Sequence, residues 1–127
     1  MVKRLLLDTD VIVDYLRGRD EAVAYLESRA EPLLLSVITV AELYAGVREG
    51  EERRVLEGFL SAFEIIPMDK EIAQKGGLYR RDYGPSHGVA LADALIAATA
   101  ELQQARLVTL NERHFPMLEV DVPYPQA

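Results

Sequence analysis

Short apolar runs alternate with longer stretches of helical spacing along the whole chain. Runs of this kind are typical of buried strands, and the longer stretches between them are typical of amphipathic helices. The apolar runs predict five strands, and Pro123 puts the last one at a sheet edge because proline cannot donate to a strand ladder. These strands are predicted at residues 2–7, 33–35, 64–67, 107–109 and 120–122.

The segments between the strands predict helices at 11–16, 21–29, 38–48, from 50 to about 62, from 69 to about 81, and at 89–104. Asp20 and Asp69 are suited to cap two of these helices. Gly76 and Gly77 weaken the middle of the fifth helix. Residues 83–88, which contain two glycines and a proline, predict a loop, and residues 111–115 predict a short turn or helix.

Strands that alternate with helices predict an α/β fold, a three-layer α/β/α sandwich with a central, mainly parallel sheet. The chain has 127 residues, which fits a single domain over residues 1–127. Ligands of such sheets bind just beyond the carboxyl ends of the strands. Asp8 follows the first predicted strand directly, and Thr109 and Asn111 lie at the end of the fourth.

The composition limits the kinds of metal site and binding partner that the chain can have. The chain has no cysteine and two histidines, so thiolate and histidine-rich metal sites are excluded, and oxygen ligands would favour Mg²⁺ or Mn²⁺. A net charge of −7 argues against tight, non-specific nucleic-acid binding, although a metal-dependent nuclease can carry it. The sequence contains no signal-peptide pattern and no long uncharged apolar run, so we expect a cytoplasmic protein without a membrane segment.

Three carboxylates stand alone on apolar elements. Asp8 follows three leucines, and Glu42 and Asp93 are each the only charge in a long apolar stretch. Structural alternatives exist: Asp8 or Asp93 could cap a helix, and Glu42 could pair with Arg4 or Arg48. A shared divalent cation is the simplest explanation of all three, because unpaired buried carboxylates are costly.

Four motifs together resemble the PIN-domain family, and most closely the VapC-type toxins of toxin–antitoxin pairs. They are DTDVIVDYL at residues 8–16, AEL at 41–43, ADALIAATA at 92–100 and LVTLNERHF at 107–115. The resemblance implies an α/β/α sandwich and an endoribonuclease that uses Mg²⁺ or Mn²⁺ to activate water. It also implies a cognate VapB-like antitoxin and a homodimer or a dimer-based hetero-oligomer.

The resemblance also implies a site of Asp8, Glu42 and Asp93. Its fourth acidic position falls on Asn111, which brings no negative charge, and Asp10 is a possible replacement as a metal ligand. Thr9 and Thr109 are expected to hydrogen-bond the ligands from behind.

Four basic residues are candidates for phosphate contact: Arg80, Arg81, Arg113 and His114. The alternative is that they belong to a solvated helix face or loop.

Two other functions remain possible for the acidic residues. The segment around Asp8 also resembles the Asp-x-Asp motif of haloacid-dehalogenase-type phosphatases, in which Asp8 would be a covalent nucleophile. The acidic cluster could instead belong to a catalytically weak binding module for a basic partner.

Overall fold

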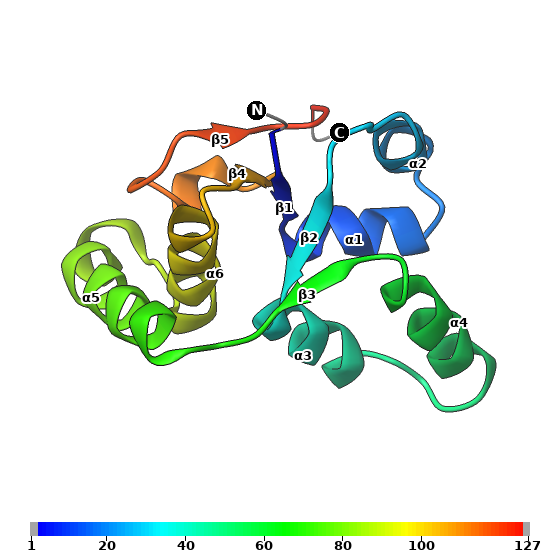
Figure 1. Ribbon diagram of the computed structural model, residues 1–127, viewed down its shortest axis with the longest axis horizontal. Helices are drawn as coiled ribbons and strands as arrows, with labels where there is room; N and C mark the ends of the chain where they lie inside the picture. Colours follow the sequence, from blue (N-terminus) through cyan, green and yellow to red (C-terminus); the bar gives the residue numbers. More distant parts are fainter. Residues whose placement is uncertain (1–2, 126–127) are drawn as a thin grey trace.

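The computed structural model describes residues 3–125, and its centre is a five-stranded parallel sheet (Figure 1). The strands follow the order β3-β2-β1-β4-β5, so β1 is central, and Leu6 is in register with Leu34 and Leu107. The strands are β1 (Leu5–Leu7), β2 (Leu33–Ser36), β3 (Glu64–Ile66), β4 (Arg106–Val108) and β5 (Val120–Asp121). Five parallel strands confirm the predicted sheet; the predicted start of the first strand, at residue 2, lies outside the described residues.

Six α-helices and one 3₁₀ helix connect the strands within residues 3–125. They are α1 (Thr9–Leu16), α2 (Asp20–Glu27), α3 (Val37–Ala45), α4 (Glu51–Leu60), α5 (Lys70–His87), α6 (Leu91–Leu102) and η1 (Glu112–His114). In the described part of the chain, no helix is both long enough and apolar enough to cross a bilayer.

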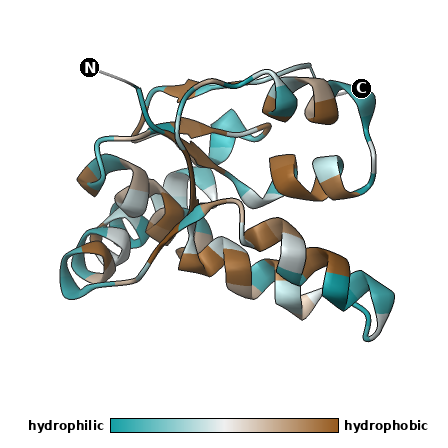
Figure 2. Ribbon diagram, turned by 45° about the vertical axis from the view of Figure 1, so that its right-hand side comes forward, coloured by the Kyte–Doolittle hydropathy of each residue, from teal (hydrophilic) through white to brown (hydrophobic). Residues whose placement is uncertain are grey.

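The pleat of β1 divides the core into two. Leu5 and Leu7 point to a cluster formed with α1 to α4, whereas Leu6 points to a second cluster formed with α5 and α6. Figure 2 shows apolar residues along the strands and on parts of the helices around them. Helices therefore cover both faces of the sheet, which confirms the predicted α/β sandwich.

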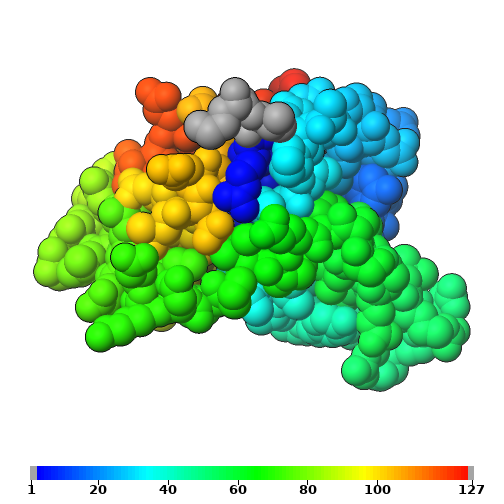
Figure 3. Space-filling view, in the orientation of Figure 1, coloured from blue at the N-terminus to red at the C-terminus, as the bar shows by residue number. Residues whose placement is uncertain are grey.

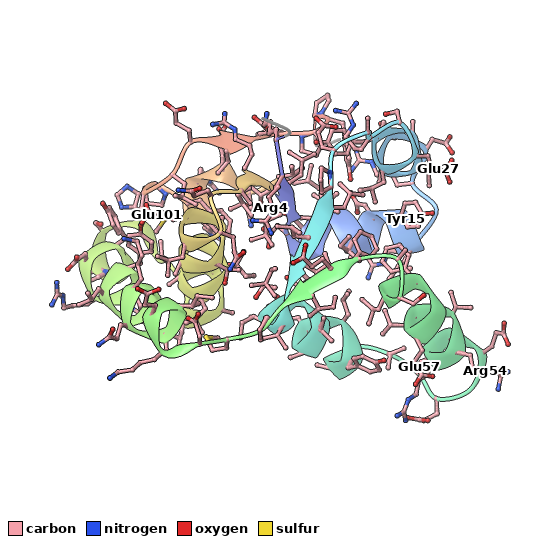
Figure 4. All side chains as sticks on the ribbon, in the orientation of Figure 1. Arg4, Tyr15, Glu27, Arg54, Glu57 and Glu101 are labelled. Carbon is pink, nitrogen blue, oxygen red and sulfur yellow. The ribbon has the colours of Figure 1, made fainter. Side chains whose placement is uncertain are left out.

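An aromatic contact attaches α4 to the rest of its layer. Tyr15 lies on the side of α1 that faces α4 (Figure 4), and its ring stacks on Phe59 with the ring centres 5.2 Å apart. The segment that leads into α4 projects at the lower right of the space-filling view (Figure 3).

The predicted loop at 83–88 is wrong, because α5 continues to His87. Pro85 lacks an N–H and removes the hydrogen bond to the Arg81 carbonyl, so the helix bears this cost in its last two turns. The helix ends at Gly88, which has a φ of +63° and donates its N–H to Gly84. Packing against α6 outweighs the local signals for a loop.

Helices α5 and α6 approach each other closely at Gly76. A Cβ added there would lie 3.1 Å from the Leu95 Cα and 2.5 Å from its Cδ2. The glycine that weakens α5 as an isolated helix therefore permits its packing. Helix α6 begins at Leu91 rather than at residue 89, which places Asp93 in its first turn.

Candidate active site

A cavity of about 640 Å³ opens beyond the carboxyl ends of β1 and β4. It brings together the three lone carboxylates of the sequence and Asn111, which come from four separate segments. The lining residues are Asp8, Thr9, Asp10, Val13, Asp14, Arg17, Arg19, Glu42, Asp93, Leu110 and Asn111. This cavity therefore has five carboxylates and two guanidinium groups on its wall.

Asp8 is the most deeply buried of these carboxylates, with 6% of its surface exposed. It is the N-cap of α1, so the structural alternative also holds: one oxygen accepts the Thr9 N–H at 2.8 Å. The other oxygen accepts the Thr109 hydroxyl at 2.8 Å. Burial raises the pKa of Asp8, and the nearby Asp10 charge raises it further, against the lowering effect of these two donors.

Asp10 carries a buried oxygen without a partner. Its Oδ2 accepts the Leu110 N–H at 3.2 Å, whereas its Oδ1 has no hydrogen-bond partner among the described residues. Burial raises the pKa of this carboxyl, and the charge of Asp14 also raises it. An unsatisfied buried carboxylate oxygen is costly, and a cation is one way to remove that cost.

Glu42 lies on α3, exposed, and accepts the Thr9 hydroxyl at 2.5 Å. Thr9 also contacts the Thr39 hydroxyl at 3.1 Å, so it connects α1 to α3. The alternative that Glu42 pairs with an arginine is wrong. Within residues 3–125 it forms no ion pair, and Arg4 lies instead 3.7 Å from Glu64.

Asp93 and Asn111 line another part of the cavity, and His114 lies against both of them. His114 Nδ1 lies 3.4 Å from Asp93 Oδ2 and 3.2 Å from the Asn111 amide nitrogen. Burial raises the pKa of Asp93, His114 lowers it and Glu42 raises it. Asn111 donates its backbone N–H to the Thr109 hydroxyl oxygen, so Thr109 links Asn111 to Asp8.

Three charged lining residues were not among the candidates selected from the sequence: Asp14, Arg17 and Arg19. Asp14 lies one helical turn beyond Asp10, and that spacing could have indicated it. Arg19 lies 3.1 Å from Asp14, whose same oxygen accepts the Tyr124 hydroxyl at 2.9 Å. No local signal connects residue 14 to residue 124, so only the fold could reveal this contact.

None of the four basic residues predicted to contact phosphate lines this cavity. Arg81 pairs with its neighbour Asp82 at 2.8 Å, and Arg80 folds over Gly84 on α5. Arg113 and His114 line a second cavity of about 450 Å³, together with His87, Glu112 and Pro116.

The donor set of the acidic cavity fits a divalent cation that prefers oxygen ligands. It offers carboxylates and an amide, and the unpartnered Asp10 oxygen is a buried acceptor without a donor. Across residues 3–125, however, no three carboxylate or imidazole groups already have the spacing of a metal-binding cluster. The ligand chemistry is therefore present, whereas a closed coordination shell is not preformed.

Comparisons with known proteins identify the family to which this arrangement corresponds. Residues 5–120 match the family model for the PIN domain. Ribonuclease VapC10 of Mycobacterium tuberculosis is 42% identical over 118 residues, covering 91% of this chain and 88% of that protein. Ribonuclease VapC19 of the same organism is 43% identical over 124 residues, covering 94% and 98%.

A solved structure agrees with these relatives. A toxin–antitoxin complex from Klebsiella pneumoniae contains a chain that matches with a TM-score of 0.84 and 31% sequence identity. The match covers 96% of this chain and 99% of that chain. The shared region thus includes the acidic cavity.

Proposed function

The chain belongs to the PIN-domain family, and on this premise we propose that it is a metal-dependent endoribonuclease, the toxin of a VapBC-type toxin–antitoxin pair. The relatives named ribonucleases and the toxin–antitoxin complex support the class. The observation that carries the metal dependence is the buried pair Asp8 and Asp10. Both carboxyls have raised pKa values, and one Asp10 oxygen has no donor among the described residues.

The proposed ligands of the cation, Mg²⁺ or Mn²⁺, are Asp8, Glu42 and Asp93, with Asp10 as the further carboxylate. When bound, such a cation supplies Lewis-acid activation of a water nucleophile and neutralises charge on the phosphate. Asp10 takes the role that the neutral Asn111 cannot fill by charge. Asn111 contributes polar contacts at the same wall.

The hydroxyls behind these carboxylates keep them oriented. Thr109 donates to Asp8, and Thr9 donates to Glu42. These hydrogen bonds orient both carboxylates and leave further oxygen lone pairs available for a cation. His114 lies against Asp93 and Asn111 and limits the movement of that wall. These residues would hold the RNA phosphate and the attacking water in line by positioning the acidic groups.

The proposed partners follow from the same class. We propose that a VapB-like antitoxin binds this chain, because the Klebsiella neighbour is part of a toxin–antitoxin complex. A homodimer is proposed for the toxin, and RNA is the proposed substrate.

The two other functions gain no support. A covalent phosphatase is not favoured, because the chain matches the PIN-domain model and its relatives are named ribonucleases. A binding module without catalysis has no feature here that favours it over a nuclease.

The test is cleavage by the purified chain. We expect RNA cleavage with Mg²⁺ or Mn²⁺, loss of cleavage in excess EDTA, and recovery when metal is restored. Production of the chain in cells should arrest growth, and the product of the neighbouring gene should relieve the arrest. Absence of metal-dependent cleavage with total cellular RNA and with synthetic RNA would contradict the proposal.

A further inference from the structure

The acidic cavity creates a problem for an RNA substrate. Five carboxylates line it, so the phosphates on either side of the cleaved one would be repelled. A single strand can lie across such a cavity only if cationic groups bind its phosphates beyond the acidic centre. The positions of free cations should therefore reveal the path of the strand.

Most basic side chains are already neutralised. Of the 14 lysines and arginines, eight have a carboxylate oxygen within 4.0 Å: Lys3, Arg4, Arg19, Arg53, Arg54, Lys75, Arg81 and Arg106. Six have no such partner among residues 3–125: Arg17, Arg29, Arg48, Lys70, Arg80 and Arg113. Arg19 is the clearest excluded case, because Asp14 and Glu21 both contact it.

Two of these six flank the acidic cavity. Arg17 lies directly after α1, is exposed and lines the cavity itself. Arg113 lies on η1 and lines the second cavity. His114 joins the two cavities, since it lines the second one and lies 3.4 Å from Asp93, which lines the first. Figure 1 shows α1 and the orange η1 segment on opposite sides of β1.

We propose that Arg17 and Arg113 bind the RNA phosphates on the two sides of the cleaved phosphate. The substrate strand then lies across the acidic cavity from the end of α1 to η1. This inference rests on the proposed ribonuclease function and adds the binding residues. Arg48 lines a neighbouring groove of about 410 Å³ beside α3 and α4, which shares Val13, Arg17 and Glu42 with the acidic cavity. Arg48 does not line the acidic cavity itself, so it is not assigned to this path.

The test measures RNA binding apart from cleavage. A fluorescent single-stranded RNA is titrated with Asp8→Asn protein, whose cleavage is disabled, at several salt concentrations. The wild-type chain in EDTA repeats the measurement in case Asp8→Asn impairs folding. Arg17→Gln and Arg113→Gln are compared with Arg80→Gln, an exposed arginine that also has no carboxylate partner among the described residues and lines none of the three cavities.

Each of the two flanking substitutions should reduce the salt slope by about 0.7 and weaken binding about fivefold at 0.1 M relative to 1 M salt. The double variant should lose the product of the two factors. Two RNAs of different sequence should show the same loss, because phosphate contacts carry no sequence information. Arg80→Gln should change neither quantity.

Three results would overturn the inference while leaving the proposed function intact. They are unchanged binding in both flanking variants, a loss in only one of them, and an equal loss in Arg80→Gln, provided that the wild-type chain cleaves RNA. A wild-type chain that neither binds nor cleaves RNA would remove the proposed function, and this inference with it.

Discussion

One aspartate on the edge strand β5 and two aspartates that follow the central strand β1 have opposite electrostatics. Asp121 on β5 accepts hydrogen bonds from Arg106 at 2.9 Å and from Lys3 at 3.1 Å. Burial raises its pKa, but these two cations outweigh burial and lower it overall. Asp8 and Asp10 have only neutral donors, so burial dominates and their pKa values rise.

The difference distinguishes an aspartate in an ion pair that stabilises the fold from aspartates whose charge the fold does not neutralise. A carboxylate that needs a cation for stability can receive one from the chain, as Asp121 does. The acidic cavity instead keeps its arginines at the rim or paired to Asp14, and leaves Asp10 with an unpartnered oxygen. Stability is given up there in a way that a bound cation would restore.

The largest expected effect concerns activity. Asp93→Asn should lower metal-dependent RNA cleavage about 10²–10³-fold, because it removes one of the charged ligands proposed to hold the cation. Asp121→Asn should leave cleavage unchanged. Its partners Lys3 and Arg106 lie at the amino ends of β1 and β4, whereas the cavity opens beyond the carboxyl ends of these strands. Steady-state cleavage of one RNA by both variants checks this, and equal losses would erase the distinction between the two groups.

The next effect is a pH dependence of stability in EDTA. Folding raises the pKa of Asp8 from 3.8 to about 7 and that of Asp10 to about 6, so the folded state holds their protons more tightly than the unfolded chain. The protonated carboxyls of Asp8 and Asp10 contribute to the free energy of unfolding below pH 3.8, and this contribution is lost as the pH rises towards 7. The double variant Asp8→Asn, Asp10→Asn should escape this loss.

Relative to the wild-type chain, the double variant should gain roughly 2–3 kcal/mol of unfolding free energy between pH 4 and pH 7.5. Urea unfolding at each pH gives the comparison. Asp121→Asn should act in the opposite window, because the lowered pKa of Asp121 stabilises the fold above pH 3.8 and that contribution disappears on acidification. If the difference in unfolding free energy between the double variant and the wild-type chain were the same at all pH values, the pKa values of Asp8 and Asp10 would not be raised by folding.

A smaller effect isolates the unpartnered oxygen. Asp10→Asn keeps an acceptor for the Leu110 N–H and replaces the unpartnered oxygen with an amide donor facing an acidic cavity. We expect the metal-free chain to gain about 1–2 kcal/mol at pH 7.5. Thermal unfolding in EDTA measures it, and saturating Mg²⁺ should reverse the order because it stabilises the wild-type chain more than the variant.

The smallest effect is expected for Asp121, whose charge is neutralised by Lys3 and Arg106. Asp121→Asn should cost less than about 1 kcal/mol at neutral pH, since its partners are partly exposed, and 1 M salt should reduce the cost further. A loss of several kcal/mol that is insensitive to salt would mean that this ion pair is structurally as important as the core.

Much of the fold could be predicted from local pattern. The run Leu5–Leu7 indicated a strand, and the alternation of strands and helices indicated a parallel sheet. The end of α5 could not be predicted, because Gly84, Pro85 and Gly88 favour a loop locally. Contact along α6 decided it, and that contact depends on Gly76, which local propensity counts against the helix.

The site divides in the same way. Asp8, Glu42 and Asp93 could be selected from the sequence because a lone charge on an apolar element is unusual wherever it folds. Arg17 and Arg19 could not, because charges near an exposed helix end are ordinary in any sequence, and only its spacing from Asp10 pointed to Asp14. Their importance comes from what lies opposite them in space.

The sequence by itself determined the element types, the family and the chemical character of the site. These depend on residue spacing and residue type, which are local properties. Only the tertiary structure decided which aspartates are neutralised and which are not. That outcome depends on the placement of Lys3 and Arg106 beside Asp121 and of neutral donors beside Asp8 and Asp10, and Coulomb energies follow distances in space rather than along the chain.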